Sequence, residues 1–276
     1  MKDASRYVAG SIDSHAHLEL FSRRGLDTAP LLREARAGGL AGIIDVGVLP
    51  SDFDRRVSAF GDQPLVSFTV GLHPTSCEPG RVDAELTLLE AALETRASAD
   101  RTSPVAVGEV GLDSYHSTEH ERLQVDVLER QAALAVGHDL PLILHNRASE
   151  PQMLAFLRRT RPRGVMHCFS QDAEYCARCL DLGLYVSFGG NITYRSSQDI
   201  RAAAALVPDD RLLVETDSPY LSPQAVRGTA NHPGHLGFVV EALAALRGVS
   251  AVHIAAVTRA NACALFGITP WSADAA

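Results

Sequence analysis

The sequence predicts an α/β fold, a single (β/α)₈ barrel of the TIM type, on three observations. The chain has 276 residues, close to the roughly 250 that such a barrel typically needs. Short apolar runs alternate with longer amphipathic runs from end to end, which indicates a parallel sheet covered by helices. Side chains that bind metals recur where the apolar runs end. Because no linker or low-complexity block interrupts the pattern, we expect one domain, 1–276, with its core at about 11–268.

Eight apolar runs are the expected strands, and helical patterns such as 120–139 and 172–183 lie between them. A last helix at 250–266 is expected to close the barrel. An open dinucleotide-binding sheet would carry G-x-G-x-x-G after its first strand, whereas this chain has DSHAHLEL there. A closed barrel is therefore favoured. The expected strands are 11–18, 41–48, 65–73, 105–113, 140–147, 164–169, 185–190 and 211–217.

Composition limits the classes of function. The formal net charge of −8 gives no global basic field for nucleic acid, so any phosphate binding must be local. Lys2 is the only lysine, which excludes a Schiff-base lysine, a phosphate-loop lysine and a carbamylated metal bridge at the strand ends. Five scattered cysteines do not form a disulfide pattern. With no membrane-length apolar run and no signal-peptide pattern, the expectation is a cytoplasmic protein without a membrane partner.

Six residues with nitrogen or oxygen ligands fall at the ends of expected strands. His15 and His17 are two apart, so strand alternation puts both side chains on one face. In a barrel, the carboxyl ends of the strands converge on one mouth, where active sites are found. A single histidine at such a position is more often structural, but a full set of this kind favours a metal site. The six are His15, His17, Glu109, His145, His167 and Asp217.

Four imidazoles and two carboxylates suit divalent ions such as Zn²⁺, Mn²⁺ or Mg²⁺. Glu109 is the natural bridging ligand, because its two oxygens can contact two ions. Two ions about 3.5–4 Å apart would clamp a phosphoryl or carbonyl oxygen and activate water. Asp217 would bind one ion and could accept the proton of the attacking water. We therefore predict a two-metal hydrolase with Glu109 and Asp217 in its catalytic machinery.

Other residues near the expected mouth are candidates for substrate contact. His73 ends the third strand, and Arg147 and Arg227 lie beyond strand ends. A guanidinium there could bind phosphate oxygens; a loop-tethering ion pair is the alternative for each arginine. Cys168 follows His167 directly, so strand alternation predicts that its thiol points away from the site and packs in the barrel.

The chain resembles the TatD family of metal-dependent deoxyribonucleases, within the amidohydrolase superfamily. The motifs that carry the resemblance span nearly the whole chain in order: IDSHAHLE, VGLHP, VGEVGLDSYH, PLILHNRA, HCFS, GLYVSFGGNIT, LLVETDSPYLSP and RGTANHP. The resemblance implies a TIM-type barrel, two divalent metals and hydrolysis of DNA, often from the 3′ end. It implies one ion on His15, His17 and Asp217, a second on His145 and His167, and Glu109 on both. It also implies that His73 contacts phosphate or donates a proton.

Departures from the family pattern affect the substrate side. Thr75 stands where a second histidine is common, and RGTANHP lacks a basic residue and a glutamate of the usual segment. All six expected ligands are kept, so hydrolysis is expected, with DNA (a single strand or a 3′ end) as the leading substrate. One alternative is hydrolysis of a small amide, lactone or phosphoester, and another is a non-catalytic metal-binding partner in a larger assembly. A shallow, arginine-lined mouth would favour nucleic acid, and a closed apolar pocket would favour a small molecule.

Overall fold

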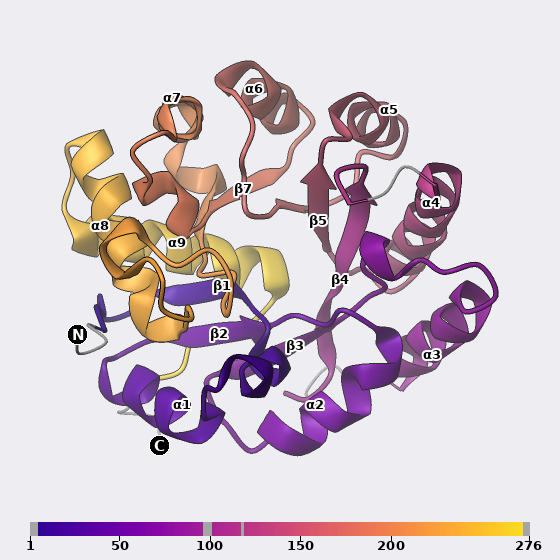
Figure 1. The fold of residues 1–276 in the computed structure, drawn as a ribbon, viewed down its shortest axis with the longest axis horizontal. Coiled ribbons are helices and arrows are strands. Elements are labelled where there is room, and N and C mark those ends of the chain that lie inside the picture. The colour runs from indigo at the N-terminus through magenta and orange to yellow at the C-terminus, as the bar shows by residue number, and fades with distance from the viewer. Residues whose placement is uncertain (1–4, 96–100, 117–118, 273–276) are drawn as a thin grey trace.

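Eight parallel strands pair in sequence order around a barrel, which confirms the predicted fold (Figure 1). The computed structural model describes residues 5–95, 101–116 and 119–272, so small parts of the expected 1–276 domain lie outside it. Most strands are shorter than the apolar runs that predicted them, because the runs continue into the loops at the mouth. The strands are β1 Ile12–Ala16, β2 Gly42–Asp45, β3 Val66–Val70, β4 Pro104–Asp113, β5 Leu142–Arg147, β6 Gly164–Met166, β7 Tyr185–Phe188 and β8 Leu212–Val214.

The barrel closes where the first and last strands meet. A parallel bridge joins Ala16 to Ser218, just beyond β8. The backbone N–H of Asp217 donates to the carbonyl of His15 across 2.9 Å, and that of His17 donates to the carbonyl of Ser218 across 2.8 Å. Closure thus brings residues about 200 positions apart in the chain side by side, and these residues include three of the expected metal ligands.

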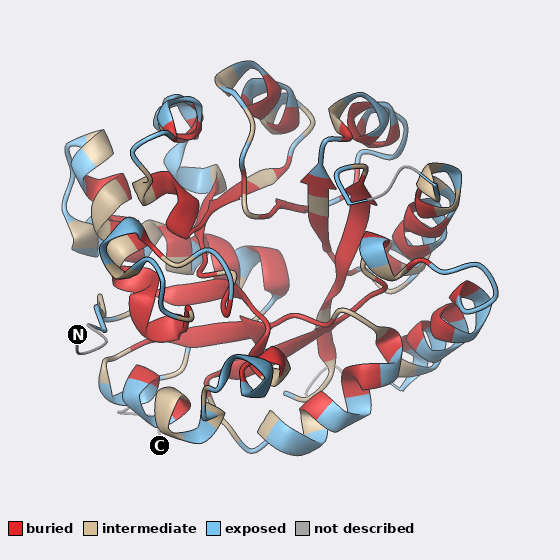
Figure 2. Cartoon of the chain, viewed as in Figure 1, coloured by how far each residue is buried: buried red, intermediate tan, exposed pale blue. Residues whose placement is uncertain are grey.

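Nine α-helices in the described residues cover the strands, with their buried faces toward the sheet (Figure 2). Of these, no single helix is long and apolar enough to cross a membrane; only the bent pair Pro233–Arg247 and Ala251–Phe266 passes by length and composition, with 110° between its members. The helices are α1 Thr28–Ala37, α2 Phe53–Phe60, α3 Val82–Glu94, α4 Glu121–Gly137, α5 Glu150–Thr160, α6 Ala173–Asp181, α7 Gln198–Leu206, α8 Leu236–Arg247 and α9 Ala251–Phe266.

The apolar core has two parts. The larger part lies between the strands and the surrounding helices. The smaller joins strand residues such as Ile12, Ile143 and Leu213 to Leu265 and Phe266 at the end of α9. The last helix therefore closes the end of the barrel where the strands begin, as the sequence predicted, and Figure 1 shows it behind the strands. The opposite end, where the strands finish, is left for the functional site.

Candidate metal centre

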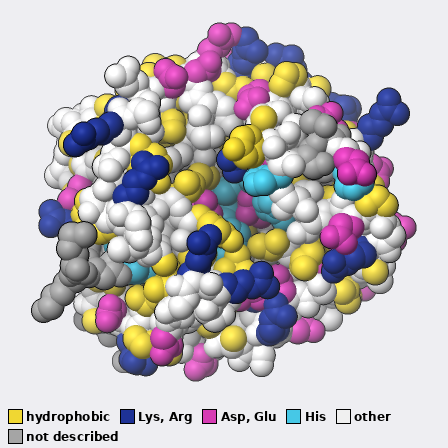
Figure 3. All heavy atoms as spheres, in the orientation of Figure 1, with side chains coloured by type: hydrophobic (Ala, Val, Ile, Leu, Met, Phe, Trp, Pro, Cys, Tyr) yellow, Lys and Arg dark blue, Asp and Glu magenta, His cyan; other side chains and the backbone are white. Residues whose placement is uncertain are grey.

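The six expected ligands come together at the open end of the barrel. His15 lies on β1 and His145 on β5, while His17, His167 and Asp217 follow β1, β6 and β8. The sequence suggested that Glu109 ends its strand. It lies inside β4 instead, because β4 stays paired with β5 as far as Asp113. Figure 3 looks into this end: histidine side chains line the floor of a central hollow, with arginine side chains around it.

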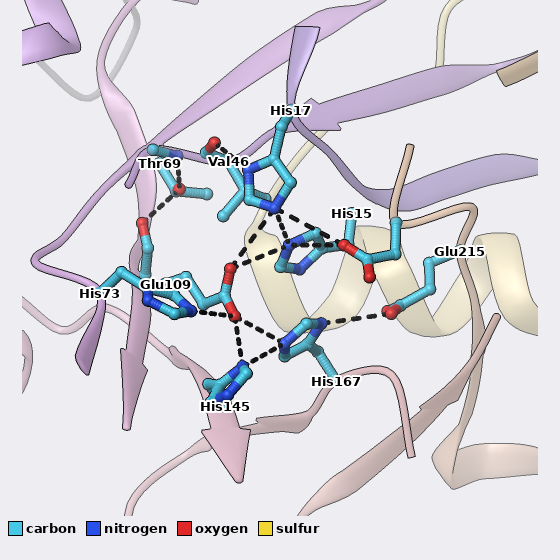
Figure 4. A network of polar contacts seen from close by, with 12 residues as sticks. His15, His17, Val46, Thr69, His73, Glu109, His145, His167 and Glu215 are labelled. Carbon is cyan, nitrogen blue, oxygen red and sulfur yellow. Dashed lines mark hydrogen bonds and ion pairs between the residues drawn. The ribbon is translucent and has the colours of Figure 1, made fainter. Parts of the chain in front are cut away.

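Glu109 is at the centre of the group, and its two oxygens face different imidazoles (Figure 4). Its Oε2 is 3.3 Å from Nε2 of His15 and 3.5 Å from Nε2 of His17. Its Oε1 is 2.8 Å from Nδ1 of His145 and 2.8 Å from Nε2 of His167. A carboxylate that presents each oxygen to a separate pair of nitrogen donors has the arrangement expected of a bridge between two ions.

Asp217 lies on the Oε2 side of Glu109. Its Oδ1 is 3.6 Å from Nε2 of His17 and 3.8 Å from Nε2 of His15. The six residues therefore divide into the two sets that the family resemblance implied, with Glu109 shared. Their roles as ligands stay predictions.

His73 also reaches Glu109, from the loop after β3, which ends at Val70 and not at His73 as the sequence predicted. Its Nε2 is 3.2 Å from Oε1 of Glu109. Its Nδ1 accepts the backbone N–H of Thr75 across 3.1 Å, in the short 3₁₀ turn Pro74–Ser76. Because a backbone N–H can only donate, a neutral His73 carries its proton on Nε2, directed into the site.

Groups behind the site fix the orientation of three histidines. Nδ1 of His17 lies 2.9 Å from the carbonyl oxygen of Val46. Nε2 of His145 lies 3.1 Å from Oδ2 of Asp113, and Nδ1 of His167 lies 3.2 Å from Oε1 of Glu215. Such outer partners decide which ring nitrogen faces a metal. Sequence reasoning did not assign Asp113 or Glu215 a role, although a carboxylate inside a run as apolar as LLVE was a signal available for Glu215.

A buried polar network supports the backbone of Glu109. The Thr69 hydroxyl donates to the carbonyl of Gly108 across 2.5 Å, and the Glu109 N–H donates to the carbonyl of Gly47 across 3.1 Å. Arg56, which is fully buried, donates to the carbonyl of Thr69 and pairs with Asp45 and Asp52. The backbone that carries Glu109 is therefore held by β3 and by the segment after β2, as well as by its own strand.

The buried carboxylates of the site favour positive charge beside them. Burial alone would raise the pKa of Glu109, but His167, His73 and hydrogen bonds from His145 and His15 hold it well below its usual value. Burial opposes protonation of His17, yet Asp217 and Glu109 raise its pKa to about 9. In the metal-free protein, protons on imidazoles therefore balance the carboxylates. Divalent ions can replace these protons, so the donor set fits metals in both composition and charge.

Three arginine–tyrosine pairs stand around the site. The guanidinium of Arg147 lies 3.9 Å from the ring centroid of Tyr115, that of Arg227 lies 4.6 Å from Tyr194, and that of Arg24 lies 5.2 Å from Tyr220. Within the described residues neither Arg147 nor Arg227 forms an ion pair, so the loop-tethering alternative is not what the structure contains. Arg147 lines the open pocket of about 1030 Å³ above the ligands. Arg227 is not among the lining residues of that pocket, but it stacks on Tyr194, which is.

Cys168 departs from its predicted packing role. Cys168 lines the same pocket and does not pack away from it. Strand β6 ends at Met166, and Cys168 adopts a positive φ of 45°, so strand alternation no longer applies there. Burial first, and then the nearby carboxylates of Asp217, Glu215 and Glu109, raise the pKa of the thiol well above its usual value. The side chain is therefore a neutral thiol beside the site.

Comparison with known proteins agrees with this geometry. The model of the family described as "TatD related DNase" matches residues 12–267. YcfH of Escherichia coli (strain K12), named an uncharacterized metal-dependent hydrolase, is 35% identical over 262 residues, covering 93% of this chain and 96% of the relative. YabD of Bacillus subtilis (strain 168), which has the same description, is 32% identical over 260 residues, covering 93% and 98%.

A solved structure gives the same result for the fold. The crystal structure of YjjV, a TatD homolog from Escherichia coli K12, has a TM-score of 0.87 and 31% identity, and covers 95% of this chain and 99% of that one. The family match, over residues 12–267, includes all eight strands and all six expected ligands. The chain therefore belongs to the TatD-related DNase family of metal-dependent hydrolases.

Proposed function

We propose that the protein hydrolyses phosphodiester bonds of DNA with two divalent ions and removes nucleotides from the 3′ end. The observation that carries the proposal is Glu109, whose two oxygens face two imidazole sets on the floor of an open pocket. His15, His17 and Asp217 would hold one ion, His145 and His167 the other, and Glu109 both. When bound, Zn²⁺, Mn²⁺ or Mg²⁺ would polarise the phosphoryl oxygen and lower the pKa of the attacking water.

The side chains supply proton transfer. Asp217 is positioned to accept a proton from water that attacks phosphorus, since its carboxylate lies at the pocket and its pKa is low: burial opposes ionisation, but His17 and the other histidines favour it. His73 directs its Nε2–H into the same space, where a hydrogen bond would stabilise the negative charge on the leaving sugar oxygen. The proton that Asp217 accepts from the attacking water can then pass to the leaving sugar oxygen, which completes the hydrolysis.

The pocket favours nucleic acid over a small molecule. It is wide, about 1030 Å³, and is lined by arginines including Arg23, Arg55 and Arg147. Tyr115 is 65% exposed and Tyr220 is 40% exposed, so both rings are available to unpaired bases, which stack on such platforms. The guanidinium groups beside these rings are suited to the phosphates of the same strand. We place the activity in the cytoplasm, in keeping with five free thiols.

The test is degradation of a single-stranded oligonucleotide labelled at either end, by protein supplied with Mn²⁺, Mg²⁺ or Zn²⁺. With a 5′ label, stepwise shortening is expected; with a 3′ label, the label should be released at once. Chelation and the Asp217→Asn variant should both stop the reaction. If the metal-loaded protein cleaves no DNA yet hydrolyses small esters or amides, the small-molecule alternative replaces this proposal.

A further inference from the structure

Glu215 lies behind the metal centre, fully buried at the end of β8. One of its oxygens, Oε1, lies 3.2 Å from Nδ1 of His167. The other, Oε2, is buried and has no hydrogen-bond partner among the described residues. Figure 4 shows Glu215 approaching His167 from the side opposite Glu109. The carboxylate thus has a second oxygen available for another donor.

His15 has a buried ring nitrogen that lacks a hydrogen-bond partner among the described residues. It is fully buried, and its Nε2 faces Oε2 of Glu109 at 3.3 Å. Its other nitrogen, Nδ1, is also buried with no hydrogen-bond partner in the described part of the chain. The ring stacks on His167 with centroids 4.0 Å apart and planes inclined by only 12°. Ligand-type atoms of His15, His167 and Glu215 lie within 4.8 Å of one another.

The tautomer of His15 determines which hydrogen bonds Nδ1 of His15 and Oε2 of Glu215 can form. If Nε2 of His15 binds an ion, its Nδ1 must carry the proton, and a buried N–H needs an acceptor. Oε2 of Glu215 is a buried acceptor that lacks a donor, and ligand atoms of the two residues lie within 4.8 Å of one another. A cation between them is disfavoured, because it would face that N–H. The described residues show no direct contact between His15 and Glu215, so one bridging water would satisfy both atoms.

We infer that Glu215 is a positioning residue for both ions, with Oε1 holding His167 and Oε2 holding His15. This inference rests on the proposed two-metal function, in which His15 and His167 belong to different ions. Glu109 would then bridge the ions on the side that faces the pocket. Glu215 would link His15, a ligand of one ion, to His167, a ligand of the other, on the opposite side. Removing the Glu215 carboxylate should therefore weaken both ions together.

Asp113 provides a matched control. It is also a buried carboxylate beside a predicted ligand, and in the described part of the chain His145, across 3.1 Å, is the only predicted ligand that it contacts. Its other contacts are to His116 and to the backbone N–H groups of Tyr115 and His116. Loss of its charge should weaken only the ion on the His145 side. Comparing the two variants therefore distinguishes a carboxylate that supports the ligands of both ions from one that supports a ligand of a single ion.

The experiment is calorimetric titration of metal-free wild type, Glu215→Gln and Asp113→Asn with Zn²⁺. Wild type should bind two ions. In Glu215→Gln both affinities should fall, each by about 10- to 100-fold, the usual effect of losing an outer partner. In Asp113→Asn only one should fall. A Glu215→Gln protein that binds either ion as tightly as wild type overturns the inference. Wild type that binds fewer than two ions overturns the two-metal proposal itself.

A second measurement needs no variant, and so does not depend on the folding of Glu215→Gln. In wild type loaded with Zn²⁺, the Nδ1 protons of His15 and His167 should both appear as hydrogen-bonded signals in slow exchange with water by histidine-selective ¹H–¹⁵N NMR. A His15 Nδ1 proton in rapid exchange with water would overturn the assignment of Glu215 to His15.

Discussion

The backbone N–H of Thr75 donates a hydrogen bond to Nδ1 of His73 across 3.1 Å, and this contact places the proton of a neutral His73 on Nε2. The Thr75 hydroxyl lies 2.7 Å from the same nitrogen. Nε2 then points toward Oε1 of Glu109 at 3.2 Å, at the floor of the pocket. A histidine held this way can donate a hydrogen bond to a leaving group through its Nε2–H, whereas its Nδ1 is not available to a metal.

Replacing His73 should therefore affect substrates according to their leaving group. In His73→Leu, kcat on an oligonucleotide should fall by about 10²- to 10³-fold, the usual effect of removing one hydrogen bond to a developing negative charge. Hydrolysis of bis(p-nitrophenyl) phosphate should fall far less, because the charge on nitrophenolate is delocalised and needs less stabilisation. Steady-state kinetics on both substrates check this. Equal losses on the two substrates would contradict a role for His73 at the leaving group.

Glu109→Gln and Asp217→Asn should differ in metal content. Glu109 faces both ligand sets, so its substitution should remove both ions, whereas Asp217→Asn should keep the ion on the His145 side. Both should lower DNA hydrolysis at least about 10²-fold, and circular dichroism should show a folded barrel. Elemental analysis after dialysis gives the metal count. Wild-type turnover by either variant would refute the mechanism.

The metal-free protein should lose stability as pH rises from about 6.5 to 9. Although burial disfavours the charged form, Asp217 and Glu109 raise the folded pKa of His17 to about 9, above the ordinary value near 6.5. A raised pKa contributes stability that is complete below the unfolded pKa and is lost as pH passes the folded one. The melting temperature of metal-free wild type should thus fall across this interval.

The control for that measurement is His17→Gln, whose melting temperature should vary less with pH over the same interval. Because an ion must displace the His17 proton, affinity for Zn²⁺ should rise with pH up to about 9. Metal-free wild type whose melting temperature rises from pH 6.5 to 9 would contradict this account of the site.

Arg147→Ala and Tyr115→Leu should weaken oligonucleotide binding without affecting the chemistry. For both, KM on single-stranded DNA should rise, while kcat/KM on bis(p-nitrophenyl) phosphate stays the same. If Arg147 contacts a phosphate, its loss should reduce the slope of log affinity against log salt by about 1. Arg33→Ala is the matched control, since Arg33 is exposed on α1 away from the pocket. An unchanged KM in both variants would remove these residues from the DNA site.

The barrel and the convergence of the ligands could be predicted because they depend on local pattern and on one geometric rule. Apolar runs mark parallel strands, and the carboxyl ends of such strands meet at one mouth. His15, His17, His145, His167 and Asp217 all follow from that rule. Glu109 was placed at the right mouth, and the predicted run 105–113 matches β4, but the residue lies inside that strand rather than at its end.

The remaining features depend on contacts that sequence spacing does not encode. Arg24 and Tyr220 meet only because the barrel closes. Cys168 turns into the pocket because β6 ends two residues earlier, at Met166. Glu215 shares an apolar run with Asp217, yet whether its side chain reaches His167 depends on how both strands are packed. Such outer contacts need coordinates.

The most direct test of the central claim, that Glu109 bridges two ions, is anomalous diffraction from crystals grown with Mn²⁺. Two peaks are expected, about 3.5–4 Å apart, one beside Oε2 of Glu109 with His15 and His17, and one beside Oε1 with His145 and His167. A single peak, or two peaks of which only one contacts Glu109, would contradict the two-metal account.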